Sequence, residues 1–187
     1  MSNYFKFFPK TMYSGRTTVD ITRRTVVLDA IAADPFILLP YTVTNDDRPE
    51  TIAEFYYGDA NKVWLVYFAN NIIDMYSQWP LSSRDFDENF KKKYAEKSGT
   101  TGFGVIAWGQ NEQITDNIIY YSKKSNSTIQ INQYTYENLT EAEQLEWEPL
   151  RYYEYETILN DNKRNIFLID SRYANKIENE LRTLVNG

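Results

Sequence analysis

The sequence of 187 residues contains no cysteine and no histidine. These two absences exclude disulfides, thiolate nucleophiles, zinc sites built from cysteine and histidine, and a histidine general base. The remaining side chains support the chemistry of carboxylates, such as two acids flanking a glycosidic bond or an oxygen-ligand metal site. Two groups of acids are candidates for such chemistry, namely Asp46 with Asp47, and the glutamates at 141, 143, 146 and 148.

Neither group of acids has the arrangement that catalysis needs. The neighbouring side chains at 46 and 47 point in different directions, and Asp47 is predicted to cap a helix. The glutamates are spread around a predicted helix instead of facing one cleft, whereas catalytic acids are pocketed groups with perturbed pKa values. We therefore expect a protein that is not an enzyme and that uses no metal and no cofactor.

Long apolar runs are also absent. No stretch approaches the roughly 18 uninterrupted apolar residues of a membrane span, and residues 1–10 contain no run of signal-peptide length. We expect a protein with no membrane partner that is made and used in a cytoplasm-like compartment. The net charge of -6 argues against a nucleic-acid partner, because binding DNA or RNA requires a basic face.

The central stretch, residues 40–82, carries the strongest structural signals. Residues 41–44 form a β-branched run bounded by proline and a polar turn, which predicts a strand. Asp47 followed by Pro49 and Glu50 is typical of a helix start, because these residues satisfy free backbone donors and preset φ.

Helical spacing places Ile52, Phe55 and Tyr56 on the inward face of this first helix. Gly58 is expected to end it, because glycine enters the left-handed conformation without steric cost. The next residue, Asp59, is predicted to cap a second helix.

The second helix, residues 60–69, is apolar on nearly all sides and must therefore be covered on more than one side. This predicts a core helix with Trp64 buried in it. Asn70 and Asn71 are expected to close the helix, because asparagine tolerates the left-handed conformation. With an extended return at residues 79–81, the predicted order is strand, helix, helix, strand.

This order and its residues resemble the LysM-like module of the baseplate wedge protein 53 family of T-even-type contractile-tailed phages. Residues 152–185 also resemble the family's C-terminal end, so the resemblance spans most of the chain. Within the module it rests on Asp47, Pro49, Glu50, Gly58, Asp59, Trp64, Asn70, Asn71, Trp79 and Pro80.

The resemblance implies an α+β fold and a structural, non-enzymatic role in the virion. Such a protein would be one of several copies in a tail baseplate wedge, would contact other wedge proteins, and would be in the host cytoplasm during assembly. True LysM modules instead bind peptidoglycan or chitin, so a glycan-binding module of a wall-associated protein is the alternative. In that alternative Trp64 and Trp79 would form a sugar platform, whereas an apolar setting favours burial of both. Binding of purified peptidoglycan would separate the two hypotheses.

We expect three regions, namely an N-terminal arm at 1–39, the LysM-like module at 40–82, and a C-terminal α+β region at 83–187 with a β-hairpin and helices. In the first region, residues 4–9 read as a short aromatic strand or hook, and residues 17–27 are rich in β-branched side chains. This region could complete the sheet of the central module or run as an arm into a neighbouring subunit.

In the C-terminal region a helix is predicted from Ser82 to about Lys97, with Phe86, Phe90 and Tyr94 at helical spacing. Lysines 91–93 either face solvent or contact an acidic partner. Residues 98–104 are predicted to form a hinge, surface loop or linker. Strands are then predicted at 105–108, 118–121, 128–131 and 166–169, a capping box at Thr140 and Glu143, and a final helix starting at Asp170 or Ser171.

The acidic stretch, residues 137–156, holds seven glutamates and one arginine, which accounts for the whole net charge. A surface of one sign steers association and rejects wrong partners. The final helix presents Tyr173, Ile177, Leu181 and Leu184 on one face, and this apolar stripe could meet a partner or close the protein's own core. The predicted partner contact comprises Glu143, Glu146, Glu148, Tyr152, Tyr153 and Tyr155.

Overall fold

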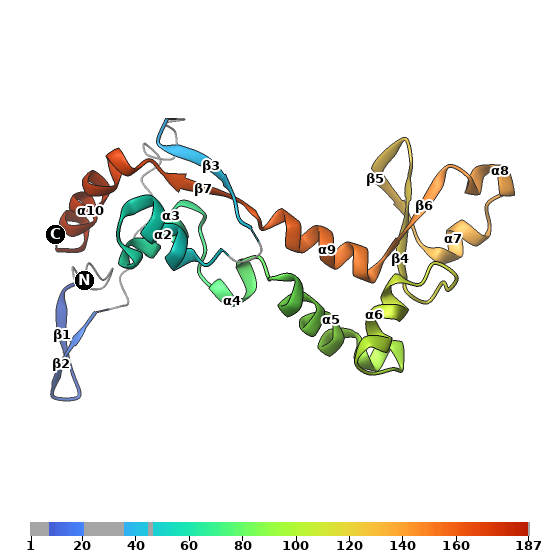
Figure 1. Cartoon of the computed structure of the whole chain (residues 1–187), viewed down its shortest axis with the longest axis horizontal. Coiled ribbons are helices and arrows are strands. Elements are labelled where there is room, and N and C mark those ends of the chain that lie inside the picture. The colour runs from blue at the N-terminus through green and yellow to red at the C-terminus, as the bar shows by residue number, and fades with distance from the viewer. Residues whose placement is uncertain (1–7, 21–35, 45–46, 187) are drawn as a thin grey trace. The chain divides into compact units, whose positions relative to one another are not determined.

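The computed structural model describes residues 8–20, 36–44 and 47–186 (Figure 1). Helices and strands are mixed, which confirms the α+β class. Contacts divide the chain into two compact units: unit 1 runs to Trp79 and resumes at Lys163, and unit 2 spans Pro80–Asn162. The predicted division at 39 and 82 differs from this one, because the chain after Lys163 returns to unit 1.

Unit 1 contains a free-standing β-hairpin, a two-stranded sheet and several helices. The elements are β1 (Lys10–Tyr13), β2 (Arg16–Val19), β3 (Leu38–Thr42), α2 (Pro49–Tyr57), η2 (Ala60–Lys62), α3 (Val63–Ala69), α4 (Met75–Gln78), β7 (Asn165–Ile169) and α10 (Ser171–Asn186). Strands β1 and β2 pair only with each other, so residues 10–19 do not complete the central sheet. The predicted hook at 4–9 lies mostly outside the described residues.

The sheet of unit 1 is formed by strands from opposite ends of the chain. Strand β3 pairs antiparallel with β7, from Leu38 opposite Ile169 to Thr42 opposite Asn165. The predicted extended return at 79–81 is therefore wrong as the second strand. The backbone of Leu81 is already occupied, because its N–H donates to Asn160 Oδ1 at 2.8 Å and its carbonyl accepts from Nδ2 at 3.0 Å.

The N-cap of helix α2 lies one residue after the predicted one. The N-cap is Arg48, which makes no side-chain capping bond, so Asp47 does not cap the helix. Gly58 ends it at a φ of 71°, which confirms the prediction. The inward face runs through Ile52 and Ala53, at 4% and 0% exposure, whereas Phe55 is 89% exposed and its predicted burial is wrong.

Asp59 does cap the following turn, because its carboxylate accepts from the N–H of Asn61 at 2.9 Å. That turn is η2, which leads directly into α3. Trp64, Leu65 and Val66 of α3 are all buried, so the prediction of a core helix is confirmed. Asn71 after the helix has a φ of 51°, in the left-handed region that asparagine tolerates.

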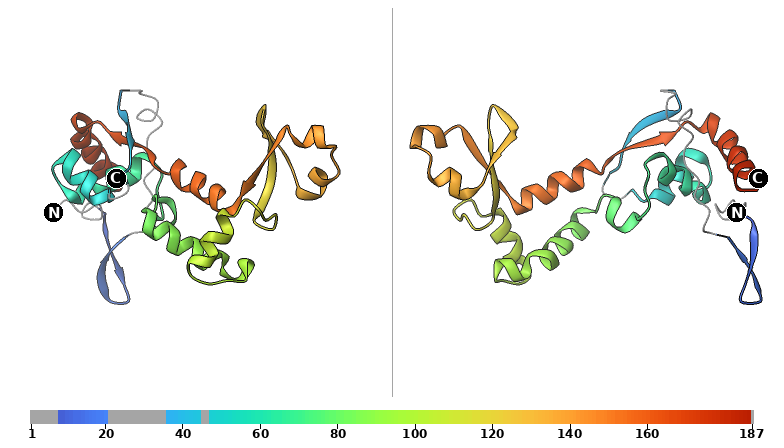
Figure 2. Two further views of the ribbon diagram at one scale, coloured as in Figure 1. Left: turned by 45° about the vertical axis from the view of Figure 1, so that its right-hand side comes forward. Right: turned by 180° about the vertical axis from the view of Figure 1, so that it is seen from behind.

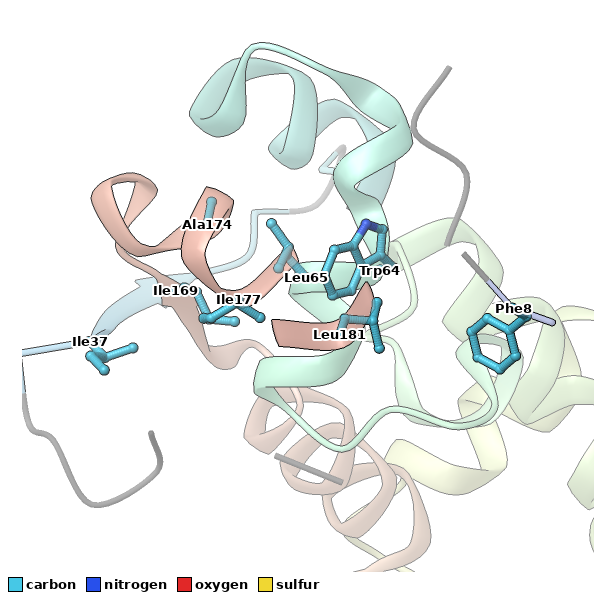
Figure 3. Close-up of a cluster of buried hydrophobic side chains, with 8 residues drawn as sticks. All are labelled: Phe8, Ile37, Trp64, Leu65, Ile169, Ala174, Ile177 and Leu181. Atoms are coloured by element: carbon cyan, nitrogen blue, oxygen red, sulfur yellow. The ribbon is translucent and has the colours of Figure 1, made fainter. Parts of the chain in front are cut away.

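Unit 1 has two hydrophobic clusters, one on each side of α3. Helix α10 closes the first with Ile177 and Leu181, which are 4% and 5% exposed (Figure 3). The interpretation of this stripe as a partner surface is therefore wrong for both residues, and the side chain of Leu184 is outside the description. The second cluster gathers Val43, Ile52, Ala53, Val66, Trp79, Ile166 and Leu168.

Unit 2 consists of helices and a three-stranded antiparallel sheet. The elements are α5 (Ser83–Ser98), α6 (Phe103–Gln110), β4 (Ile118–Lys123), β5 (Asn126–Ile131), α7 (Gln133–Glu137), α8 (Glu141–Gln144), β6 (Trp147–Arg151) and α9 (Tyr152–Asn162). The sheet order is β5-β4-β6, with β4 in the middle. Figure 2 shows the yellow strands β4 and β5 and the orange strand β6 from two further sides. The strands predicted at 118–121 and 128–131 are confirmed, as is the N-cap at Ser82.

The strand predicted at 105–108 is wrong, because these residues belong to helix α6. Val105 and Trp108 lie three residues apart and pack with Phe90 and Tyr94 of α5 in the core of unit 2. Their β-branched and aromatic character suits a strand, but burial against α5 overrides this weak preference. The linker prediction is correct for residues 99–102, whereas Ser98 belongs to α5 and residues 103 and 104 belong to α6.

Candidate interaction surfaces

Strand β7 has its outer edge closed by side chains. The Asn70 amide pairs with Phe167 as a backbone strand would, with Nδ2 donating to the carbonyl at 2.8 Å and Oδ1 accepting from the N–H at 2.8 Å. The same Nδ2 also donates to the Val66 carbonyl of α3 at 2.8 Å. The Tyr57 hydroxyl donates to the Ile169 carbonyl at 2.9 Å, and burial raises the pKa of Tyr57. Asn70 therefore joins the end of α3 to a strand 97 residues away.

Both tryptophans that a sugar platform would need are buried. Trp64 is 7% exposed and Trp79 is 9% exposed. The indole Nε1 of Trp79 donates to the carbonyl of Asp47 at 3.2 Å, so its polar edge is occupied. The two rings contribute to the core of unit 1 and do not present a face to a glycan.

The carboxylate of Asp47 fixes the loop between β3 and α2 instead of the helix start. It accepts from the Thr44 N–H at 2.8 Å and from the Tyr41 hydroxyl at 3.1 Å. The bond from the Thr44 N–H lowers the pKa of Asp47. Burial and the nearby carboxylate raise the pKa of Tyr41. Pro49 and Glu50 follow in the first turn of α2, as predicted.

The predicted acidic contact residues lie on α8, in the turn that follows it and on β6, and all three are exposed. We call Glu143, Glu146 and Glu148 the acidic surface. The capping box is confirmed, because Glu143 Oε2 accepts from the Thr140 N–H at 2.9 Å, and bonds from Thr140 lower the pKa of Glu143. Glu146 lies 3.1 Å from Lys123 Nζ.

The acidic stretch keeps most of its negative charge. Among the described residues, ion pairs neutralise Glu146 and Glu156, the latter by Lys93 Nζ at 2.7 Å. Glu156 also accepts from the hydroxyl of Tyr94 at 2.6 Å. No cation of the described residues pairs with the other five glutamates of the stretch, namely Glu137, Glu141, Glu143, Glu148 and Glu154.

The neighbouring tyrosines are largely used within unit 2. The ring of Tyr152 stacks on Trp108 at 5.8 Å between centroids. The ring of Tyr153 packs edge-on against Phe90 at 5.0 Å, and its hydroxyl donates to Asp87 at 3.0 Å. Burial and this carboxylate raise the pKa of Tyr153. These rings are half-buried, as is Tyr155, so they contribute to packing within unit 2 more than they extend the acidic surface.

The sequence analysis did not predict the structural roles of two buried asparagines of unit 2. Asn117 is fully buried, and its Nδ2 donates to the carbonyls of Trp108 at 2.7 Å and Asn111 at 2.8 Å. It thereby holds the loop after α6 against the end of that helix. Asn160 ties α9 to Leu81, as described above. Neither asparagine belongs to a periodic pattern, so no local signal in the sequence identifies them.

The described part of the chain contains no group of three or more acidic side chains that could hold a metal ion. Of the helices formed by these residues, none combines the length and the apolar character that crossing a membrane requires.

The motif residues cap helices, close a strand edge and fill cores, while an exposed surface of one charge lies on unit 2. The family described as base plate wedge protein 53 matches residues 4–184, and the chain belongs to this family. The resemblance seen in the sequence is thereby confirmed, and the protein has a structural role in the phage tail baseplate. No curated protein matches the sequence.

Proposed function

We propose that this protein joins wedge subunits and neighbouring wedges of the baseplate through protein–protein contacts, with the acidic surface as one contact. The observation that carries the proposal is the exposed charge of Glu143, Glu146 and Glu148 between the start of α8 and β6, where only Glu146 pairs with a cation of the described residues. Charge of one sign at a rim raises association rates and rejects partners of like charge. The complementary partner would present lysine or arginine side chains.

The local structure suits a contact that is formed without refolding. The capping box fixes Glu143 at the start of α8, and Lys124 Nζ donates to the Leu145 carbonyl at 2.8 Å after that helix. The backbone that carries the three acids is therefore held in place before a partner arrives. A preorganised surface loses less entropy on binding.

The test is a charge-neutralising variant compared with a matched control. Glu143→Gln, Glu146→Gln and Glu148→Gln together remove three charges and keep an acceptor oxygen for the capping box. The control carries Glu54→Gln, Glu96→Gln and Glu112→Gln, which remove the same charge from other exposed positions. Purified wedge proteins are mixed with each form, and the fraction of wedges joined into baseplates is measured.

The proposal predicts fewer joined wedges for the first variant and normal joining for the control. Equal joining by both variants and the parent would place the contact elsewhere. An equal loss in both would show that only total charge matters. Binding of the parent protein to purified peptidoglycan, assayed beside these reactions, would favour the glycan-binding alternative.

A further inference from the structure

The hairpin β1–β2 is locally well formed. Its two-residue turn, Ser14 and Gly15, has φ values of 50° and 73°. Positive φ at both central residues defines the type I′ turn, whose twist matches that of the flanking strands. The pairing of Tyr13 with Arg16 through Lys10 with Val19 is regular.

The same hairpin lacks a covering layer. All eight strand residues are exposed, and Met12 and Tyr13 have exposed fractions of 68% and 73%. A single two-stranded hairpin is at best marginally stable in water, because neither face is buried. Hydrophobic side chains in this setting favour coverage by another molecule.

The outer edges of the hairpin are open. The Asp20 N–H donates to the Pro9 carbonyl at 2.8 Å, which sets the alternation of bonded and non-bonded pairs in the ladder. The backbone groups that point outward belong to Lys10 and Met12 on β1 and to Thr17 and Val19 on β2. Within the described part of the chain, no hydrogen bond uses these outward groups.

Three of the other sheet edges are blocked. The outer edge of β3 carries Pro40, which has no N–H, and the outer edge of β7 is closed by Asn70 and Tyr57. Pro149 lies at an outward position of β6, by the alternation that the bond from Lys124 to the Glu146 carbonyl sets. Blocking by proline is a common protection of natural edge strands. The hairpin has no such protection, so an edge contact fits it.

The positive side chains of the hairpin indicate which kind of partner edge it would pair with. The hairpin carries Lys10 and Arg16 within its strands, followed by Asp20 directly after β2, in a chain of net charge -6. A partner edge beside acidic side chains would complement it. Of the strands formed by the described residues, the remaining edge strand is β5, which has no charged residue and begins beside Lys123 and Lys124, so this edge in a second copy does not offer that complement.

We propose that β1–β2 adds edge-on to an open strand of another baseplate protein, one that carries acidic side chains beside that strand. Strand addition of this kind gains main-chain hydrogen bonds, while side chains supply specificity. The inference rests on the proposed function only in that it assumes a partner within the baseplate.

The experiment compares two substitutions at one position. Met12→Pro removes an outward N–H and leaves the inner ladder of the hairpin intact, whereas Met12→Ala keeps that N–H and shortens the side chain. A second pair, Thr17→Pro and Thr17→Ala, does the same on β2. Each variant is added to purified wedge proteins, and its affinity for the assembled wedge is measured together with its thermal stability.

The proposal predicts that the proline variant on the pairing strand binds about tenfold or more weakly, because one main-chain bond is lost, while its alanine counterpart binds nearly as the parent does. Parent-like binding by both proline variants would overturn the proposal. A hairpin-dependent dimer of the free protein would overturn it too, since the partner would then be a second copy. If the parent protein itself did not bind wedge proteins, the proposed function would be refuted together with the hairpin proposal. If the parent binds and both proline variants bind equally well, the hairpin proposal alone is refuted.

The charge component has its own control. Lys10→Glu with Arg16→Glu should slow association most at low salt, where screening is weak. Lys92→Glu with Lys176→Glu makes the same charge change at exposed helical positions and should have little effect. Equal slowing by both pairs would contradict an acidic flank on the partner edge.

Discussion

The sheet of unit 1 and the acidic surface of unit 2 use polar residues in opposite ways. Around β7, the amide of Asn70 and the hydroxyl of Tyr57 are directed inward to satisfy backbone groups. Between the start of α8 and β6, Glu143, Glu146 and Glu148 are exposed, and most glutamates of the acidic stretch pair with no cation of the described residues. The comparison indicates that Asn70 and Tyr57 stabilise the sheet of unit 1, whereas the acidic surface of unit 2 leaves carboxylates exposed to solvent.

The strongest test of this comparison is Trp64→Ala. Trp64 is 7% exposed within the first cluster, and truncation of a large core aromatic lowers the free energy of unfolding by about 3–5 kcal/mol. Phe55→Ala is the matched control, because this neighbouring aromatic is 89% exposed and should change stability by about 0.5 kcal/mol or less. Equal denaturation midpoints for the two variants would show that the assigned burial is wrong.

The second test concerns packing in unit 2. A Cβ added at Gly109 would lie 2.7 Å from Cζ of Phe90, a side chain that is itself buried. Gly109→Ala should therefore destabilise unit 2 by about 1–3 kcal/mol, as overpacking does. Gly104→Ala is the control, since its closest contact is Thr100 Oγ1 at 3.0 Å on an exposed turn that can shift. Chemical denaturation followed by tryptophan fluorescence measures both, and an unchanged Gly109→Ala protein would contradict the packing of α5 on α6.

The third test measures how much the Asn70 amide stabilises the edge of β7. Replacing it with alanine removes the amide that satisfies both backbone groups of Phe167, so the free energy of unfolding should fall by about 1–3 kcal/mol. Asn71→Gly is the control, because glycine adopts the φ of 51° found there at no steric cost. Hydrogen exchange at Phe167 should accelerate only in Asn70→Ala. Unchanged exchange would mean that the strand edge is closed in some other way.

The smallest effect concerns pH. The pKa of Asp47 is lowered in the folded protein by the bond from the Thr44 N–H, so the stabilisation that it provides is complete above the unfolded pKa. It is lost as the pH falls below about 4 and through the folded pKa. Asp47→Asn should therefore show a shallower loss of stability in this range than the parent. Parallel stability curves for the two proteins would contradict the assignment.

Local signals in the sequence predicted the helix starts and ends well. Ser82, Thr140 with Glu143, and Gly58 act through neighbours within a few residues, so their roles follow from spacing alone. Asp47 failed as a cap because the helix starts one position further on, and the carboxylate instead bonds the loop behind it.

The pairing of the strands could not be predicted in the same way. The partner of β3 is β7, and the choice depends on bonds such as those of Asn70 to Phe167, which connect residues 97 positions apart. Helix α6 was missed for a related reason, since Val105 and Trp108 are placed by contact with α5.

For the candidate site, sequence located the exposed acids but not the use of its tyrosines. Net charge and spacing pointed to Glu143, Glu146 and Glu148, and all three are exposed. Tyr152 and Tyr153 looked equally available, yet their rings pack on Trp108 and Phe90 of their own unit. Burial of an amphipathic ring depends on tertiary neighbours that spacing along the chain does not specify.

The most direct measurement of the central claim is the salt dependence of the association rate between this protein and the other wedge proteins. If Glu143, Glu146 and Glu148 steer assembly, the rate for the parent and for the Glu54, Glu96 and Glu112 control should fall steeply as salt rises, because screening shortens the reach of surface charge. The variant with all three acids of the acidic surface changed to glutamine should associate more slowly at low salt and respond weakly to added salt. Identical salt slopes for this variant and the parent would contradict the account.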